Sequence, residues 1–294
     1  MVGVDSASLE EVITGNFPQA YIFGAGAVGK SILPLVKKQY KIMGFVDNDS
    51  AKWGRDFEGF SICDPKTILE TNHDAIIIAS NAGVSAITEQ LLGLGVSPSR
   101  IVTDFVDYTV KSRIVFLESL GILFREENIR GSMAECGVFL GEFAREINRV
   151  FPKQKLYLFD TFAGFDARDM AIEQDNKYTE LGANHFNITS EELVLSKMPH
   201  PDMCVVRKGY FPETTEGLED SFCFVNLDFD LYNPTYAGLE YYSPRMVKGG
   251  VILIHDYFSG SFEGVGAAVR DYYKDSKVHS LLPIGDWLSV AVRF

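Results

Sequence analysis

Cysteine is scarce in this sequence, and its spacing excludes two classes of site. The 294 residues contain four cysteines, Cys63, Cys136, Cys204 and Cys223. They are widely spaced and form no Cys-x-x-Cys pair, so neither a zinc site nor a disulfide framework is indicated. Three lie in apolar surroundings and are expected to act as small buried hydrophobic residues. We therefore expect a reducing, cytoplasmic compartment.

Positive charge is also in short supply. Lysine and arginine number 27 against 40 aspartates and glutamates, which gives a formal net charge of −13. Binding to a phosphate backbone needs clustered lysine and arginine. The sequence has no basic run and no aromatic ladder interleaved with arginine. Nucleic acid is not expected as a partner.

Long apolar runs are absent as well. No run approaches the roughly 18 apolar residues of a membrane-spanning helix. The first residues lack the positively charged segment and apolar core of a signal peptide. What remains, 46% hydrophobic and 23% charged residues, is typical of a globular protein. The length predicts about two domains, each with its own core.

Two apolar runs in the second half of the chain end abruptly in acidic or imidazole side chains. They are residues 225–232 (VNLDFDLY) and residues 254–257 (IHDY). Such runs predict buried strands, and ligands bind beyond the carboxyl ends of strands in open α/β sheets. The candidates for surrounding one divalent cation or one reacting hydroxyl are Asp228, Asp230, His255 and Asp256. Alternatively, Asp230 and Asp256 only cap helices.

The first hundred residues contain a GxGxxG fingerprint. After a short helix predicted over residues 1–18, a strand breaks into the glycine loop 24–29 and a helix begins there. The next strand ends at Asp47. In this pattern the glycines let the backbone approach a pyrophosphate, and the acid takes a ribose hydroxyl. We predict a small Rossmann-like domain over residues 1–107, with a nucleotide site formed by Gly24, Gly26, Gly29 and Asp47.

Three uses of this first domain stay open. It can bind a nucleotide or nucleotide-sugar, serve for docking or oligomerisation without a ligand, or hold NAD for a redox reaction. No hydride-transfer constellation such as Tyr-x-x-x-Lys follows within it, which disfavours the redox use. Residues 48–65 resemble small Rossmann-like sensor domains that precede carbohydrate-modifying enzymes.

A second glycine loop follows in the middle of the chain. A short strand over 132–136 leads through residues 137–141 into a helix over 142–151. The next strand, residues 155–160, ends at Asp160, and an acid there can hold two ribose hydroxyls. Because this loop lacks the GxGxxG phosphate cradle, a nucleoside without pyrophosphate is the better ligand.

The remaining segments complete the second predicted domain, residues 108–294. Residues 104–128 predict one or two helices, interrupted at Gly121. Residues 166–190 are polar and acidic without apolar periodicity, which predicts a surface loop. Residues 280–292 predict a β-hairpin. We therefore expect an α/β protein with two Rossmann-like domains.

Six blocks in the second half carry a resemblance to a known family. In order they are AECGVFLGEFA, LYLFDTFAGFD, NITSEELV, RKGYFPETT, LDFDLYNPT with PRMVKGG, and IHDY. They resemble the macrocin O-methyltransferase family, which includes S-adenosylmethionine-dependent sugar O-methyltransferases. The resemblance covers residues 130 to about 275 and excludes the first domain. It implies a class I methyltransferase sheet ending in an antiparallel hairpin, and a homo-oligomer. It also implies that residues 166–190 form a lid.

The resemblance also implies a cofactor site for S-adenosylmethionine. Glu135, Gly137 and Gly141 are then expected to line the methionine part, and Asp160 to hold the ribose. Thr161 and Phe162 are expected to cover the adenosine edge. The segment expected to close over the adenine is Lys208, Gly209, Tyr210 and Phe211.

For the metal, the resemblance implies Mg²⁺ held by three acids. Asp228 and Asp256 match two of them, but His255 stands where the family typically has an aspartate. Mg²⁺ prefers oxygen ligands, whereas imidazole suits Mn²⁺ or Zn²⁺. Either Asp230 supplies the missing oxygen or His255 serves as general base. A metal-free reaction with Asp228 or His255 as base also stays open.

The resulting prediction is an S-adenosylmethionine-dependent O-methyltransferase, assisted by Mg²⁺ or Mn²⁺, that acts on a hydroxyl of a sugar or glycoconjugate. The expected catalytic residues are Asp228, His255 and Asp256, with Asp230 as a further metal ligand. Two alternatives remain. One is an NAD-dependent nucleotide-sugar oxidoreductase that uses the first glycine loop, and the other is a non-catalytic nucleotide-binding scaffold.

Overall fold

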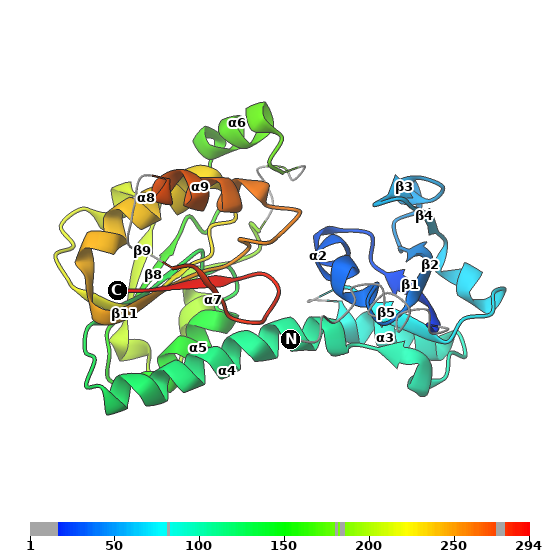
Figure 1. Cartoon of the computed structure of the whole chain (residues 1–294), viewed down its shortest axis with the longest axis horizontal. Coiled ribbons are helices and arrows are strands. Elements are labelled where there is room, and N and C mark those ends of the chain that lie inside the picture. The colour runs from blue at the N-terminus through cyan, green and yellow to red at the C-terminus, as the bar shows by residue number, and fades with distance from the viewer. Residues whose placement is uncertain (1–16, 81–82, 180–181, 183–185, 275–279) are drawn as a thin grey trace, which may run out of the picture. The chain divides into compact units, whose positions relative to one another are not determined.

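The chain divides into two compact units, Met1–Asp107 and Tyr108–Phe294, and each contains its own sheet (Figure 1). The structure, a computed structural model, describes residues 17–80, 83–179, 182, 186–274 and 280–294. The helix predicted over residues 1–18 therefore lies almost entirely outside the described residues.

Unit 1 is built on a six-stranded sheet in the order β3-β4-β2-β1-β5-β6. All neighbouring pairs are parallel except β3 with β4. The strands are β1 (Gln19–Phe23), β2 (Lys41–Val46), β3 (Asp56–Phe57), β4 (Phe60–Cys63), β5 (Ala75–Ile78) and β6 (Ile101–Val102). Helix α2 (Ala27–Val36) packs on one face and α3 (Val84–Gly93) on the other. Strands β1 and β5 are almost continuously apolar because both of their faces are covered.

Unit 2 is built on a seven-stranded sheet in the order β12-β13-β11-β10-β7-β8-β9. Its strands are β7 (Ser132–Cys136), β8 (Leu156–Asp160), β9 (Cys204–Lys208), β10 (Phe222–Leu227), β11 (Met246–Ile254), β12 (Leu282–Pro283) and β13 (Val290–Arg293). Strands β7 to β11 run parallel, whereas β13 is antiparallel to β11 and β12 to β13. The predicted α/β class and the closing antiparallel hairpin are confirmed.

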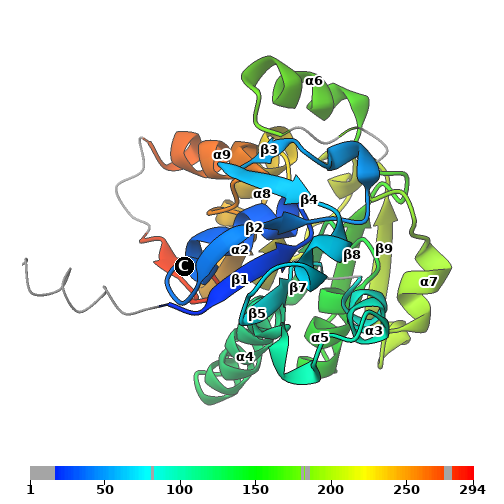
Figure 2. The same ribbon diagram turned by 90° about the vertical axis from the view of Figure 1, so that its right-hand side faces the viewer.

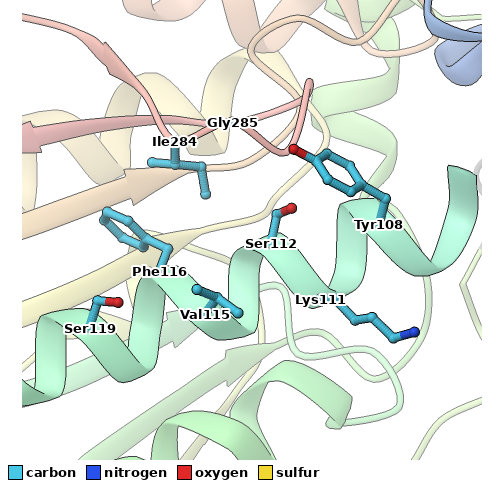
Figure 3. A pocket seen from close by; sticks show the side chains of 8 residues that line it. All are labelled: Tyr108, Lys111, Ser112, Val115, Phe116, Ser119, Ile284 and Gly285. Atoms are coloured by element: carbon cyan, nitrogen blue, oxygen red, sulfur yellow. The ribbon is translucent and has the colours of Figure 1, made fainter. Parts of the chain in front are cut away.

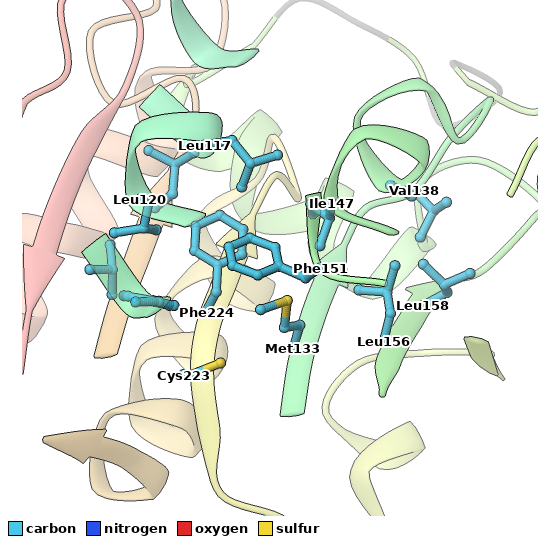
Figure 4. Close-up of a cluster of buried hydrophobic side chains, with 14 of the residues drawn as sticks. Leu117, Leu120, Met133, Val138, Ile147, Phe151, Leu156, Leu158, Cys223 and Phe224 are labelled. Carbon is cyan, nitrogen blue, oxygen red and sulfur yellow. The ribbon is translucent and has the colours of Figure 1, made fainter. Parts of the chain in front are cut away.

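Helices cover both faces of this sheet (Figures 1 and 2). Helices α4 (Asp104–Glu126), α5 (Glu142–Val150) and α7 (Glu191–Ser196) pack on one face, and α8 (Tyr232–Tyr242) and α9 (Glu263–Tyr273) on the other. In the first layer Leu117, Met133 and Phe224 are fully buried (Figure 4). Burying each such side chain contributes about 1.5–3 kcal/mol. These two cores fix the strand ends where the polar residues lie.

The helix at residues 104–126 is continuous, so the predicted interruption at Gly121 is wrong. A Cβ on Gly121 would lie 2.6 Å from Cγ1 of Val150 at the end of α5. Glycine inside a helix costs about 1 kcal/mol relative to alanine. Here the small size of Gly121 allows α4 to pack closely against α5. This packing explains why a glycine occurs in the middle of a continuous helix.

The first part of the polar segment 166–190 forms a helix and not the predicted surface loop. Residues Ala167–Asn176 form helix α6, and the side chain of Asp166 caps it by accepting a hydrogen bond from the Arg168 amide. Asp169 in the first turn suits the positive end of the helix dipole. Within this segment, residues 180–181 and 183–185 lie outside the described residues. The expectation of a lid over the site stays a prediction.

Over the part of the chain that the structure describes, no helix combines the length and apolar character needed to cross a membrane.

Candidate active site

Three side chains predicted from the sequence meet at the carboxyl ends of β10 and β11. The two strands are parallel neighbours with Leu227 opposite Ile254, so the residues that follow them converge. Nδ1 of His255 lies 2.8 Å from Oδ1 of Asp228 and 2.6 Å from Oδ2 of Asp256. One ligand atom from each of the three residues falls within 4.8 Å of the others.

An arginine completes this cluster. Arg113, on α4, places its guanidinium 3.0 Å from Oδ2 of Asp228 and 3.5 Å from the side-chain oxygen of Asn226. The guanidinium also lies 4.2 Å from the ring centre of Phe143. Neither Arg113 nor Asn226 was predicted from the sequence. The patterns that could have indicated them are a charged residue within an apolar helix pattern (Arg113) and an amide inside a fully buried strand (Asn226).

The electrostatics of the cluster favour one ionised carboxylate between two cations. Burial raises the pKa of Asp228, but attraction to His255 and Arg113 outweighs it and holds that pKa well below its usual value. For His255, burial and Arg113 lower the pKa, while Asp228 and Asp256 more than reverse this and raise it to about 10. Without a bound cation, His255 is therefore protonated at neutral pH.

The donor set fits a borderline divalent cation. His255 is surrounded by two carboxylate oxygens, yet its buried Nδ1 has no well-directed hydrogen bond. A ring nitrogen and two carboxylates are ligands that Mn²⁺ or Zn²⁺ accepts. A cation at this position would compete with the proton on His255 for the same nitrogen.

Asp230 lies next to the cluster but outside the three-residue group. Its backbone has a φ of +65°, a left-handed conformation that is uncommon for a non-glycine residue. Burial, together with repulsion from Asp256 and Asp228, raises the pKa of Asp230 well above its usual value. These contacts favour the neutral form of Asp230, and its role as a metal ligand stays a prediction.

The second glycine loop lies directly beside this cluster. Gly137 follows β7 with a φ of +86°, and a Cβ there would lie 2.0 Å from the backbone oxygen of Asp228. Only glycine permits this approach of two strand ends. Glu135, one residue before Cys136, is buried and accepts a hydrogen bond from Asn226 at 3.2 Å. Burial, followed by repulsion from Asp228, raises the pKa of Glu135 well above its usual value.

Asp160 is hydrogen-bonded to the second glycine loop. Its Oδ2 accepts hydrogen bonds from the amides of Val138 and Phe139, both at 2.8 Å. Its Oδ1 accepts one from the amide of Phe162 at 2.7 Å. Each carboxylate oxygen has two acceptor positions, so Oδ1 retains one for a ligand hydroxyl. The predicted ribose contact is compatible with this geometry and stays a prediction.

The other predicted cofactor residues surround the same strand ends. Gly141 starts α5 at a φ of +78°. The Thr161 hydroxyl donates to the carbonyl of Gly164, and Phe162 is largely buried. These contacts shape the turn after β8.

The segment after β9 lies alongside that turn. The amide of Gly209 donates to the Asp160 carbonyl at 2.9 Å. Lys208 pairs with Glu191 at 3.1 Å, and Phe211 is buried against Phe159. Tyr210 is half-buried. Phe211 therefore belongs to the core, and the adenine contacts predicted for Lys208, Gly209 and Tyr210 stay predictions.

In unit 1 the four predicted nucleotide residues also lie together, but their contacts differ. A Cβ on Gly24 would lie 2.6 Å from the Ala79 oxygen, and one on Gly29 would lie 2.2 Å from the Gly24 oxygen. Both glycines are thus explained by internal packing. A Cβ on Gly26 meets nothing within 4 Å.

The acid of this first loop is paired with a cation of its own domain. Oδ2 of Asp47 accepts from the Ala25 amide at 2.9 Å and from Lys52 at 3.0 Å, and Oδ1 accepts from the Asp49 amide at 2.9 Å. Lys52 also donates to the Ala25 carbonyl. Oδ1 of Asp47 keeps one acceptor position, as Oδ1 of Asp160 does. What distinguishes Asp47 from Asp160 is its ion pair with Lys52.

A hollow of about 420 Å³ lies elsewhere in unit 2, between α4 and the final hairpin (Figure 3). It is lined by Tyr108, Lys111, Ser112, Val115, Phe116, Ser119, Ile284 and Gly285. Its lining has no carboxylate or imidazole, so it offers none of the usual protein ligands for a divalent cation.

The fold and the position of the site together define the structural class of unit 2. A parallel sheet closed by an antiparallel hairpin, with polar groups at the strand ends, is the class I methyltransferase fold. Two solved structures share it. The O-methyltransferase NovP is 22% identical to this chain. The match covers 62% of this chain and 79% of NovP, with a TM-score of 0.51. CalS11, a calicheamicin methyltransferase, is 21% identical to this chain. The match covers 72% of this chain and 92% of CalS11, with a TM-score of 0.51. At these identities the likeness shows the fold alone.

The model of the macrocin-O-methyltransferase (TylF) family matches residues 107–293, and the chain belongs to this family. A separate model, described as C2185-like, N-terminal, matches residues 18–102. A relative from Streptomyces olivaceus, 8-demethyl-8-(2,3-dimethoxy-alpha-L-rhamnosyl)-tetracenomycin-C 4'-O-methyltransferase, is 25% identical over 161 residues. The match covers 50% of this chain and 59% of that relative, so it spans less than two thirds of the relative's length.

Proposed function

We propose that this protein transfers the methyl group of S-adenosylmethionine to a hydroxyl of a sugar or glycoconjugate. The observation that carries the proposal is the juxtaposition of the second glycine loop with the Asp228–His255–Asp256 cluster. A Cβ on Gly137 would meet the Asp228 backbone at 2.0 Å, and this close approach supports a donor site directly beside the acidic cluster. The S. olivaceus relative, named as a methyltransferase of a rhamnosyl group, supports a sugar acceptor.

The glycine loop and Asp160 would position the donor. Asp160 holds the amides of Val138 and Phe139 and keeps one acceptor position on Oδ1 for a ribose hydroxyl. Gly137 brings this loop against the backbone of Asp228, so the donor would lie beside the acidic strand end. Alignment of the reacting oxygen, carbon and sulfur near attack distance supplies a large part of the catalysis.

The acidic cluster would orient the acceptor. Its hydroxyl oxygen attacks the methyl carbon, the carbon–sulfur bond breaks, and its electron pair remains on the sulfur of S-adenosylhomocysteine. Asp228, held ionised, accepts the hydroxyl hydrogen bond. Because its low pKa makes it a weak base, it takes the proton only as the forming oxygen–carbon bond makes the hydroxyl strongly acidic. A positioned base of this kind typically contributes 10²–10⁴-fold. A divalent cation, if bound by Asp228, His255 and Asp256, would lower the pKa of the hydroxyl.

The oxidoreductase alternative is not favoured by the contacts in unit 1. Asp47, which a dinucleotide ribose would require, forms an ion pair with Lys52 at 3.0 Å, whereas no cation pairs with Asp160 among the described side chains. A nucleotide-sugar or docking role for unit 1 stays open.

The test is methyl transfer from radiolabelled S-adenosylmethionine to a panel of nucleotide-linked deoxysugars and free glycosides, with Mn²⁺ or Mg²⁺ added. The expected result is label in a sugar, with an O-methyl group assigned by NMR. Label in none of the panel, together with no binding of S-adenosylhomocysteine, would refute the proposal. An Asp228→Asn variant serves as the inactive control.

A further inference from the structure

We propose that Asp169, on helix α6, is a positioning residue that holds Tyr210 against the cofactor site and couples it to the start of α8. The inference rests on the proposed function, because Tyr210 matters only if a nucleoside ligand binds beside Asp160. It assigns a role to a helix whose polar sequence gave no apolar pattern.

Helix α6 buries two acids on the face that it turns toward the domain. Asp169 is 4% exposed and Glu173, one turn later, is 0% exposed. Two like charges at i and i+4 destabilise a helix, and a buried carboxylate costs free energy unless it is hydrogen-bonded. A helix selected for stability alone would carry apolar residues at these positions. The buried acids therefore indicate a role in placing other groups.

Asp169 joins two segments that are distant in the sequence. Its Oδ1 accepts a hydrogen bond from the Tyr210 hydroxyl at 2.9 Å and another from the Asn233 side chain at 3.2 Å. Tyr210 follows β9, whereas Asn233 is in the first turn of α8. One carboxylate oxygen thus connects the predicted adenine side of the site to the helix that follows the acidic strand end.

Tyr210 is held on more than one side. The guanidinium of Arg168, the neighbour of Asp169, lies 3.5 Å from the centre of its ring. Arg168 is itself held by Asp166 at 2.9 Å and Glu213 at 2.8 Å. The preceding Gly209 amide is bonded to the Asp160 carbonyl. The ring is therefore fixed by Arg168 and Asp169, and the residue before it is bonded to the acid that is predicted to hold the ribose.

The second buried acid fastens the same helix to α8. Oε1 of Glu173 accepts a hydrogen bond from the Tyr232 amide at 2.7 Å. This amide begins α8, whose own N-cap residue, Leu231, has no side-chain acceptor. A Cβ on Gly264 would lie 2.8 Å from Glu173, so α9 begins with a residue small enough to admit the carboxylate. Since Tyr232 follows Asp230 by two residues, α6 is bonded to both sides of the site.

The experiment measures the affinity of the full chain for S-adenosylhomocysteine by isothermal titration. The variants are Asp169→Ala, Asp169→Asn, Tyr210→Phe and the Asp169→Ala/Tyr210→Phe double variant. Asp175→Ala is the matched control, because it removes an exposed acid from the same helix. Thermal unfolding of each variant is followed in parallel to establish that it is folded.

We expect Asp169→Ala to weaken binding about ten-fold and Tyr210→Phe by several-fold. The double variant should be no weaker than Asp169→Ala, because the two changes break one interaction. Asp169→Asn should stay within about two-fold of the parent, because both observed hydrogen bonds end on Oδ1 and an amide oxygen accepts them equally. Asp175→Ala should bind like the parent. A merely structural Asp169 would lower the unfolding temperature without this pattern.

Binding by folded Asp169→Ala within two-fold of the parent would overturn the inference, as would additive losses in the double variant. Should the alanine variant not fold, the contrast between Tyr210→Phe and Asp169→Asn decides in the same way. Failure of the parent itself to bind S-adenosylhomocysteine is distinguishable, because it removes the proposed function and this inference together.

Discussion

The two glycine loops of this chain share the same local hydrogen bonding but lie in different surroundings. In each unit a strand leads into a glycine turn, and the next strand ends in an aspartate that binds the turn. Asp47 holds the Ala25 amide, and Asp160 holds the amides of Val138 and Phe139. A strand-end acid after a glycine loop therefore does not by itself indicate a nucleotide site, because its first partners are the loop's own amides.

What distinguishes the loops is their surroundings. In unit 1, Lys52 neutralises Asp47 and crosses to the Ala25 carbonyl. In unit 2 no cation pairs with Asp160 among the described side chains, and Gly137 brings the loop against Asp228. The chemistry-bearing cluster lies next to the second loop. The predictions below test whether that difference separates a working site from a structural one.

The largest effect is expected from Asp228→Asn. The amide removes the ionised group between His255 and Arg113 while keeping its size, so methyl transfer should fall by about 10³-fold or more. Affinity for S-adenosylhomocysteine should stay within about two-fold. Rates are measured with labelled donor, and Asp202→Asn, an exposed acid, is the control. An active Asp228→Asn enzyme would show that the cluster is not the reacting site.

Alanine in the two loops gives the next contrast. Gly137→Ala places a Cβ 2.0 Å from backbone at a φ of +86°. The left-handed conformation alone costs about 1–2 kcal/mol, and the clash adds to it. Gly26→Ala meets open space at a φ of −148° and should change the free energy of unfolding by less than about 0.5 kcal/mol. Urea unfolding measures both. Equal destabilisation would contradict the comparison.

His255→Asp tests the metal preference at the second loop. The substitution restores three oxygen ligands, which Mg²⁺ prefers to imidazole. We expect the ratio of Mn²⁺-supported to Mg²⁺-supported activity to fall about ten-fold in the variant. The parent should lose activity in a chelator and regain it with Mn²⁺. An unchanged ratio would place His255 outside the metal shell.

The smallest effect is expected from Lys52→Ala in unit 1. Its ion pair with Asp47 is partly exposed, with 35% of the Lys52 side chain accessible, and such pairs contribute about 0–1 kcal/mol. The free energy of unfolding should fall by no more than this, and methyl transfer should be unchanged. A large loss of transfer would mean that the first loop takes part in the reaction.

Much of the fold follows from sequence pattern. The strands that end at Cys136, Asp160 and Leu227 were predictable because they are apolar runs bounded by glycine or acidic residues. Helix α6 was not, because its inner face buries Asp169 and Glu173 in place of apolar residues. The helix break predicted at Gly121 was wrong because the glycine serves tertiary packing. Contact with Val150 requires a small residue there within a continuous helix.

The site was predictable where it depends on strand ends and not where it depends on packing between elements. Parallel neighbours bring Asp228, His255 and Asp256 together, as expected from their positions. Arg113 comes from a helix more than a hundred residues earlier, and no local pattern links it to Asp228. The GxGxxG spacing likewise gives no sign of the ion pair between Asp47 and Lys52.

Hydrogen exchange of the full chain with and without S-adenosylhomocysteine tests the central claim most directly. The account predicts ligand-dependent protection of amides at residues 135–141, 160–165 and 208–211. It predicts no change at residues 24–30 and 47–52. Protection at the first loop with none at the second would contradict it.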